Sequence, residues 1–380
     1  MNSQSSKALT LLGCVLMGSI AQASQSPSPR ELSGGLLFEE VTRSSDILWG
    51  FDFISGEEVL WTERSGKLVR FHLKTKVRQE ISGLPKVWAK GQGGLLDIRV
   101  DPQDKSRVYF TYSAEVSGKG GATALGTAKI QGSALTEFKQ LFVSNTPTSS
   151  GQHFGSRIEF DSPNTLIFSI GDRGEREFVQ NPKSHNGKVI RLTRDGQIPS
   201  DNPFANSPSH APEVFTLGHR SPQGLAMRSD SLLVLAEMGP RGGDEINILK
   251  PRGNYGWPIL TFGREYWGPR IGEGSTKAGF ESPVHQWTPS ISPSGIVWVE
   301  DKTLFPSWKG SLLVGCLSGK QMRRIEFQKV GNQWSFLREQ SLLADLDARI
   351  RNLRMGPDGA LYLSTDGGVF GRVSPGKKFQ

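Results

Sequence analysis

Residues 350–368 read IRNLRMGPDGALYLSTDGG, two partly apolar stretches joined by a Gly-Pro-Asp-Gly turn. Alternation of apolar and polar residues is typical of a β-strand with one buried face, and turn residues between two such stretches predict a hairpin. Similar segments occur five more times, at 49–66, 93–113, 155–174, 223–239 and 294–319. The six copies predict a chain built from one repeated β unit.

The spacing of the copies predicts how the units are arranged. They begin 44 to 71 residues apart, whereas a four-stranded propeller blade needs about 40–50 residues, so the longer units carry inserted loops. Six blades that close into a ring leave no long sheet edge exposed. We therefore predict an all-β, six-bladed β-propeller with long inserted loops on one face, in which Leu36-Leu37-Phe38 completes the last blade. Two stacked β-sandwiches are the alternative.

The composition excludes several classes of protein. Of the 380 residues, 36% are hydrophobic and 22% are charged, and 45 Gly with 22 Pro indicate many tight turns. This composition excludes coiled-coil, collagen-like and disordered chains. The net charge of +8 is scattered, so we expect a mild preference for anionic ligands and no nucleic-acid partner. Beyond the N-terminus, no apolar run approaches the ~18 residues of a transmembrane segment.

The first 23 residues resemble a secretory signal peptide. Lys7 supplies a positive charge, residues 8–20 are mostly apolar, and Ala21-Gln22-Ala23 is a small-x-small cleavage site. We predict an exported protein, periplasmic or secreted. Leu11-Leu12-Gly13-Cys14 also resembles a lipobox, so lipid anchoring through Cys14 is the alternative.

The mature chain is expected to contain a flexible N-terminal segment at 24–34 and a single catalytic propeller domain at 35–380. Cys316 is then the one remaining Cys, and its LLVGC context predicts a buried strand residue. We expect a monomer or a homodimer.

The third unit contains a candidate acid–base pair. His153 lies in GQHFGSRIEF, where the inner strand should face the central channel, and Asp172 lies in SIGDRGER after the next strand. A carboxylate beside an imidazole fixes its tautomer and increases its basicity. The two residues predict a general base, although a His considered alone is more often structural.

The fourth unit contains a turn-rich acidic loop, GPRGGDE at 239–245. Exposed main-chain carbonyls and two adjacent carboxylates supply the oxygen ligands that suit Ca²⁺. A solvated turn is the alternative, and the sequence offers no Cys/His cluster for zinc or iron.

Three arginines, Arg220, Arg349 and Arg351, lie where inner strands should begin. Arg349 and Arg351 alternate, so both should point the same way, and converging guanidinium groups predict a ligand with several carboxylates. Trp287 offers a flat wall for a planar ligand or a sugar, or it is a core residue.

Nine motifs, taken in order, resemble those of the soluble pyrroloquinoline-quinone (PQQ) dependent sugar dehydrogenases, the glucose/sorbosone and aldose sugar dehydrogenase group. The motifs are GQGGLLDI (91–98), HFGSRIEF (153–160), GDRGER (171–176), SHNGKVIRL (184–192), GHRSPQGLA (218–226), GPRGGDEIN (239–247), NYGWP (254–258), WTPSISPSG (287–295) and ARIRNLRMGPDGALYLSTD (348–366). The resemblance implies a six-bladed propeller that oxidises the anomeric hydroxyl of a sugar to a lactone by hydride transfer to Ca²⁺-bound PQQ.

The resemblance also implies a role for each matching residue. It makes His153 the base that takes the hydroxyl proton, Asp172 its support, and Arg220 a neighbour of the quinone oxygens. The other implied contacts are Gln92, Ser221, Arg349 and Arg351 with the cofactor; Gln92, Asp244 and Trp287 with the substrate; the Gly239 and Pro240 carbonyls with the Ca²⁺ that also binds PQQ; and Glu245 and the Tyr255 carbonyl with a second, structural Ca²⁺.

Two residues depart from the family pattern. Ser221 replaces an Asn of the family's HRNPQG, and Ser318 lies where some members carry a cofactor-binding lysine, which puts two cofactor contacts in question. Two other functions remain open: a Ca²⁺-dependent propeller hydrolase resembling a lactonase, and a binding propeller without redox activity. The expected partners are a sugar and an unidentified electron acceptor.

Overall fold

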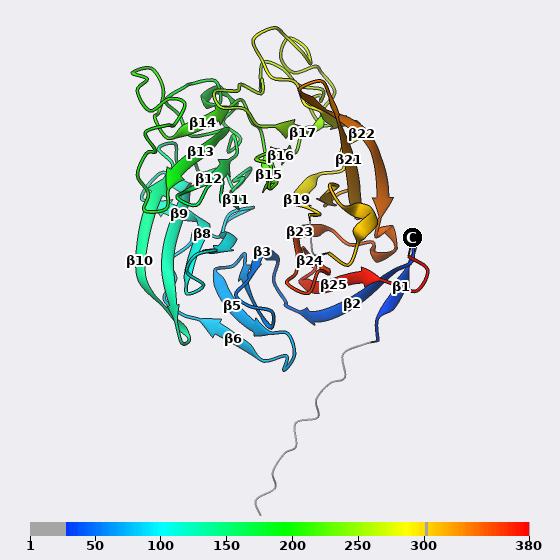
Figure 1. Ribbon diagram of the computed structural model, residues 1–380. Coiled ribbons are helices and arrows are strands. Elements are labelled where there is room, and N and C mark those ends of the chain that lie inside the picture. Colours follow the sequence, from blue (N-terminus) through cyan, green and yellow to red (C-terminus); the bar gives the residue numbers. More distant parts are fainter. Residues whose placement is uncertain (1–27, 301–302, 380) are drawn as a thin grey trace, which may run out of the picture.

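The computed structural model describes residues 28–300 and 303–379, whose strands form six antiparallel sheets around a central axis (Figure 1). From the axis outward, the first sheet contains β3 (Leu48–Phe53), β4 (Glu58–Glu63), β5 (Lys67–His72) and β6 (Arg78–Ile81). The second sheet contains β7 (Leu95–Val100), β8 (Arg107–Val116), β9 (Gly120–Gln131) and β10 (Ala134–Val143). The third sheet contains β11 (Ile158–Glu159), β12 (Thr165–Ile170), β13 (Lys188–Thr193) and β14 (Val214–Leu217).

The remaining sheets continue around the ring. The fourth contains β15 (Pro222–Met227), β16 (Leu233–Glu237), β17 (Asp244–Ile248) and β18 (His285–Trp287), the fifth β19 (Pro293–Trp298), β20 (Leu312–Cys316), β21 (Met322–Val330) and β22 (Gln333–Leu342), and the sixth β23 (Ile350–Met355), β24 (Leu361–Thr365), β25 (Val369–Pro375), β2 (Leu36–Arg43) and β1 (Arg30–Leu32). The helical elements described are three 3₁₀ turns: η1 (Arg176–Phe178), η2 (Pro306–Trp308) and η3 (Ala344–Leu346). The predicted six-bladed all-β propeller is confirmed, and each copy of the repeat forms the two inner strands of one blade.

The two ends of the chain close the ring in the sixth blade. The predicted strand at Leu36-Leu37-Phe38 is part of β2, which pairs with β25 in antiparallel register (Figure 1). Within the segment expected to be flexible, β1 pairs with β2, so residues 30–32 are ordered by the sheet. The predicted signal peptide and Cys14 lie outside the described residues.

The hydrophobic core lies between neighbouring blades, because the two faces of each blade are covered by the blades on either side of it. Trp61 of β4 is wholly buried between Phe71 of its own blade, at a ring distance of 5.2 Å, and Phe370 of the sixth blade, at 5.8 Å. Truncating such a residue typically costs about 3–5 kcal/mol of stability. Cys316 is fully buried at the end of β20, as its context predicted.

A buried arginine fills the axis and joins the blades. Arg157, just before β11, is 3% exposed and donates hydrogen bonds to the carbonyls of Trp49 (3.3 Å), Gln223 (2.8 Å) and Arg351 (2.7 Å), and to the Asp97 carboxylate (3.1 Å). These partners belong to blades one, four, six and two. Arg157 therefore fixes the inner strands relative to one another.

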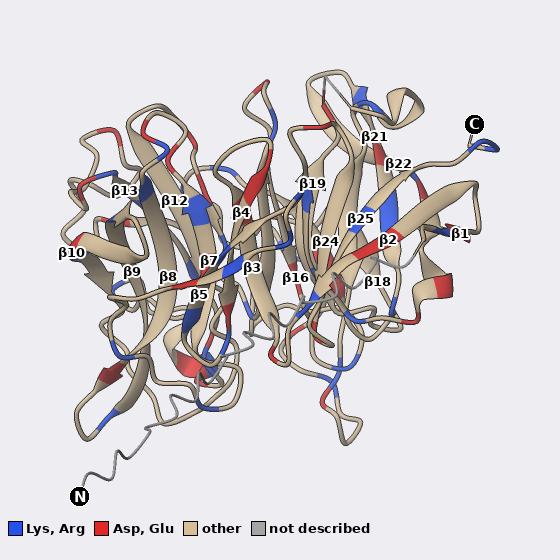
Figure 2. Ribbon diagram, turned by 90° about the horizontal axis from the view of Figure 1, so that it is seen from below, with Lys and Arg blue, Asp and Glu red and all other residues tan. Residues whose placement is uncertain are grey.

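Basic and acidic residues are interspersed along the strands and loops (Figure 2). This distribution differs from the single basic face that nucleic-acid binding favours. In the described part of the chain, no helix is long and apolar enough to cross a membrane.

Candidate active site

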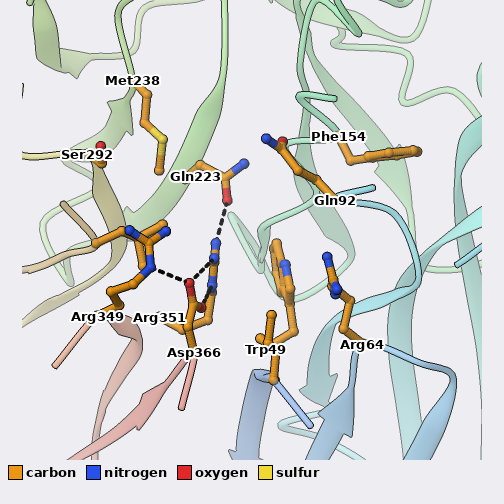
Figure 3. A pocket seen from close by; sticks show the side chains of 12 residues that line it. Trp49, Arg64, Gln92, Phe154, Gln223, Met238, Ser292, Arg349, Arg351 and Asp366 are labelled. Carbon is orange, nitrogen blue, oxygen red and sulfur yellow. Dashed lines mark hydrogen bonds and ion pairs between the residues drawn. The ribbon is translucent and has the colours of Figure 1, made fainter. Parts of the chain in front are cut away.

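A cleft of about 250 Å³ lies where the innermost strands begin and the second strands end, and Figure 3 shows the side chains that line it. Three of the side chains that line it come from the innermost strands of the first, fourth and sixth blades, and the others come from loops next to strands. They are Ile47, Trp49, Arg64, Gln92, Phe154, Gln223, Met238, Ser292, Leu317, Arg349, Arg351 and Asp366.

One side of the cleft carries a pair of arginines on a shared carboxylate. Asp366 accepts hydrogen bonds from Arg349 Nε (2.9 Å) and from Arg351 Nε (2.7 Å) and Nη2 (3.0 Å), as Figure 3 shows. Burial alone would raise the pKa of Asp366, but the charges of Arg351 and Arg349 hold it below its usual value. Both guanidinium groups thus face the same way, and together with Asp366 they leave one net positive charge.

His153 and Asp172 lie in direct contact beside the cleft. His153 Nδ1 is 2.7 Å from Asp172 Oδ1, and the carboxylate is 3% exposed. The oxygens of Asp172 also accept the Gly174 N–H (2.8 Å) and the Trp257 indole N–H (2.8 Å). Burial would raise the pKa of Asp172, but the hydrogen bond to His153 holds it below its usual value. An ionised Asp172 favours the proton on Nδ1, which leaves Nε2 free to accept a proton from a substrate.

The loop that carries His153 is held in a conformation that L-residues seldom adopt. His153 has a φ of 47°, and its backbone N–H donates to the Gln92 carboxamide oxygen (2.8 Å). The Arg173 guanidinium donates to the carbonyls of Ser150 (2.7 Å) and Gln152 (2.8 Å) and lies over the Phe154 ring. Burial lowers the pKa of Arg173 to about 9, although the charges of Asp172 and Glu175 act in the opposite direction.

The loop at 239–245 is braced from both sides. Arg220 Nη1 donates to the Gly239 carbonyl (2.8 Å) and to the Met238 carbonyl (3.2 Å). The fully buried Asp244 carboxylate accepts the backbone N–H groups of Gly239 (2.9 Å), Ile291 (2.7 Å) and Ser292 (2.7 Å). Asp244 therefore joins two loops, and its side chain does not line the cleft.

A buried carboxylate, Glu237, faces a partly buried one, Glu245, behind this loop. Glu237 and Glu245 are register partners on β16 and β17, and both accept N–H groups of the Asn247 amide, at 3.0 and 3.1 Å. Glu237 also accepts the Arg220 backbone N–H (2.8 Å) and contacts His219 Nδ1 (3.0 Å). Burial, and then the charge of Glu237, raise the pKa of Glu245 well above its usual value. A small cavity bordered by Gly239, Glu237, Glu245 and Tyr255 adjoins the pair.

The structure does not bring every expected residue to the cleft. Trp287 is 6% exposed, packs between the fourth and fifth blades, and donates its indole N–H to Glu339 (2.9 Å). It occupies the core position that the sequence left as the alternative. Ser221 is buried, and the Ser318 hydroxyl is 2.8 Å from that of Ser292.

Several residues at the site escape sequence reasoning. Arg64, Met238, Leu317 and Asp366 all line the cleft, and each directly follows the second strand of its blade: β4, β16, β20 and β24. This shared position in the repeat is the signal that would have identified Arg64. Trp257 lies in the NYGWP motif, but nothing in that motif indicates a hydrogen bond to Asp172.

Comparisons with known proteins agree on one family. A family model described as glucose/sorbosone dehydrogenase matches residues 45–372. The aldose sugar dehydrogenase YliI of Escherichia coli is 38% identical over 341 residues, which cover 87% of this chain and 90% of that protein.

Solved structures show the same similarity. The apo-form crystal structure of the soluble aldose sugar dehydrogenase from Escherichia coli superposes with a TM-score of 0.84 at 36% identity and covers 90% of this chain and 99% of that one. The PQQ-bound aldose sugar dehydrogenase from Streptomyces coelicolor has a TM-score of 0.72 at 27% identity and covers 90% and 99%. The chain belongs to the glucose/sorbosone dehydrogenase family of sugar oxidoreductases.

Proposed function

We propose that the protein is a PQQ- and Ca²⁺-dependent aldose dehydrogenase that oxidises the anomeric hydroxyl of a sugar to a lactone. The observation that carries this proposal is a cleft that combines carboxylate-binding arginines with an adjoining His–Asp pair. The relatives described above, one of them a PQQ-bound protein, support the same activity.

The residues of the cleft fit an anionic, planar cofactor. Three arginines and one carboxylate line the cleft, which leaves two positive charges to be matched by a ligand. Arg349 and Arg351 would bind carboxylates of PQQ, and Gln92 and Arg220 would approach the quinone end. Trp49, which also lines the cleft, supplies an aromatic surface. When bound, PQQ supplies the hydride acceptor.

The paired carboxylates fit a calcium ion. Two Glu side chains that face each other on neighbouring strands repel unless a cation or a proton lies between them, and carboxylates and carbonyls are the ligands that Ca²⁺ prefers. Glu245 and the Tyr255 carbonyl would hold this structural ion, with Glu237 beside them. The described residues contain no group of three or more His, Cys, Asp and Glu that could hold a metal ion by themselves, so carbonyls would complete the shell.

A cofactor-bound Ca²⁺ is a further part of the proposal. The Gly239 and Pro240 carbonyls would contact it, and a carbonyl oxygen has two lone pairs. The Gly239 carbonyl already accepts one hydrogen bond from Arg220, so a second lone pair remains for a metal.

The chain's own residues then divide the work of substrate activation. His153 Nε2 would accept the proton of the anomeric hydroxyl, and Asp172 would stabilise the resulting imidazolium. Gln92 and Arg173 hold the loop so that the imidazole keeps its position, as their contacts with residues 150–153 support. Arg220 would stabilise negative charge that develops on the acceptor.

The arginine pair, Arg349 and Arg351, favours a dehydrogenase over the two alternative functions, a hydrolase and a binding propeller. A lactonase-like hydrolase has no need of arginines for an anionic cofactor, and a binding propeller has no need of a His–Asp pair. We further propose that the protein is exported, on the evidence of its N-terminal sequence.

The test is reconstitution of the purified apoprotein. PQQ and Ca²⁺ are added together and singly, and reduction of an electron-accepting dye is followed with a panel of aldoses. We expect reduction only with both additions. Absence of any sugar-dependent reduction at saturating PQQ and Ca²⁺, with lactone hydrolysis present, would replace the dehydrogenase by the hydrolase.

A further inference from the structure

Arg64 is a cleft residue that the proposed function leaves without a role. It directly follows β4 and lines the cleft on the opposite side of Trp49 from the Arg349–Asp366–Arg351 group (Figure 3). Its guanidinium donates a hydrogen bond to the Gly91 carbonyl, next to Gln92. This contact fixes the side chain in the cleft wall.

The charge of Arg64 is not neutralised within the described residues. The neighbouring carboxylate, Glu63, has its own partners: it accepts the Ser44 hydroxyl (2.7 Å) and the Trp61 indole N–H (3.2 Å), and it pairs with Arg78. Asp46 accepts the backbone N–H groups of Ile47 (2.7 Å) and Ser65 (2.8 Å). No carboxylate in the described ranges forms an ion pair with Arg64.

The repeat places Arg64 in the same blade position as Asp366. In the sixth blade this position carries a carboxylate that pairs with two arginines, whereas in the first blade it carries a guanidinium without a carboxylate partner among the described residues. The cleft thus has one net positive charge on each side of Trp49. A single ligand that neutralises both would carry anionic groups on two edges, and Trp49 offers an aromatic surface for the part between them.

We propose that Arg64 is a third carboxylate-binding arginine of this cleft, and that it binds a carboxylate of the cofactor on the edge opposite to the one held by Arg349 and Arg351. This inference rests on the proposed function. A guanidinium can bind a carboxylate with two parallel hydrogen bonds, which a lysine cannot do. A carboxylate on the substrate, as in a uronic acid, is the other source of the same chemistry.

The test is titration of the Ca²⁺-loaded apoprotein with PQQ, followed by quenching of tryptophan fluorescence. The variants are Arg64→Met, Arg64→Gln, which keeps an N–H donor for the Gly91 carbonyl, and Arg64→Lys, which keeps the charge. Lys105→Met removes one charge from an exposed turn and is the matched control. Thermal melting checks that each variant is folded.

We expect Arg64→Met and Arg64→Gln to weaken PQQ binding about tenfold or more, the usual effect of losing a charged hydrogen bond. Arg64→Lys should lie between these variants and wild type, and Lys105→Met should match wild type. Wild-type affinity in Arg64→Gln would overturn the inference while leaving the proposed function intact. Unchanged PQQ affinity with a selective loss of uronic acid oxidation would assign Arg64 to the substrate. A wild-type protein that does not bind PQQ would overturn the proposed function, and the inference with it.

Discussion

The His153–Asp172 pair and the Glu237–Glu245 pair each join a buried residue to a partly buried one, but only the first is electrostatically complete, because the second places two carboxylates face to face. Asp172 accepts three hydrogen bonds, from His153, Gly174 and Trp257, and its pKa is lowered. Glu245 faces a second carboxylate and its pKa is raised. The difference separates a site whose charge the chain balances by itself from a site whose carboxylates must be neutralised by a cation or a proton.

The largest expected effect concerns the complete pair. His153→Gln should lower turnover with PQQ, Ca²⁺ and an aldose by about 10²–10⁴-fold, because a positioned base typically contributes that much. PQQ affinity and the stabilisation by Ca²⁺ should stay as in wild type. A variant that keeps full turnover would remove His153 from the mechanism.

The stability of the Glu237–Glu245 pair, in contrast, should depend on bound metal. We expect Ca²⁺ to raise the melting temperature of the wild type, since a ligand at 100 times its Kd stabilises a protein by about 2.7 kcal/mol. Glu245→Gln should lose most of this increase. The measurement is calorimetry with Ca²⁺ or with a chelator, and equal stabilisation of both proteins would place calcium elsewhere.

The same pair predicts a pH dependence of the metal-free protein. A carboxyl whose pKa is raised by folding contributes stability that is present below its unfolded pKa of about 4.5 and is lost as the pH rises through the folded pKa. The wild type should therefore lose stability relative to Glu245→Gln as the pH rises from 5 to 8 without metal. A constant difference between the two melting temperatures over this range would contradict the raised pKa.

A smaller effect on turnover is expected when Trp257 is replaced, because Trp257 contacts Asp172 of the His153–Asp172 pair. Trp257→Phe keeps the ring and removes the hydrogen bond to Asp172, a loss of about 0.5–1.5 kcal/mol. Turnover should fall by roughly three- to tenfold, and the pH profile of kcat should shift, because Asp172 is less firmly held. Trp257→Phe with an unchanged pH profile would reduce Trp257 to a packing residue.

The sequence predicted the fold further than it predicted the site. Period-2 alternation and turn residues identified all six units and the N-terminal strand that closes the ring, because these features depend on local pattern and on repetition. The residue pattern and the family resemblance both named His153 and Asp172, which the structure brings together. It also named Trp287 and Asp244, whose side chains pack in the core and between two loops.

The residue at which each strand ends could not be predicted from the sequence. Arg64 and Asp366 reach the cleft because each is the first residue after the second strand of its blade, and strand ends are set by pairing with the neighbours. One of the three hydrogen bonds on Asp172 likewise comes from Trp257, 85 residues away along the chain. Such contacts depend on how neighbouring blades and their loops pack rather than on local pattern.

In the proposed function, His153 and Asp172 activate a sugar beside a cofactor held by arginines. The most direct test is rapid mixing of PQQ- and Ca²⁺-loaded protein with an aldose in the absence of an electron acceptor, while the absorbance of the bound quinone is followed. We expect rapid reduction in the wild type, and reduction slowed by about 10²–10⁴-fold in His153→Gln with PQQ still bound. Equal rates of cofactor reduction in the two proteins would contradict the account.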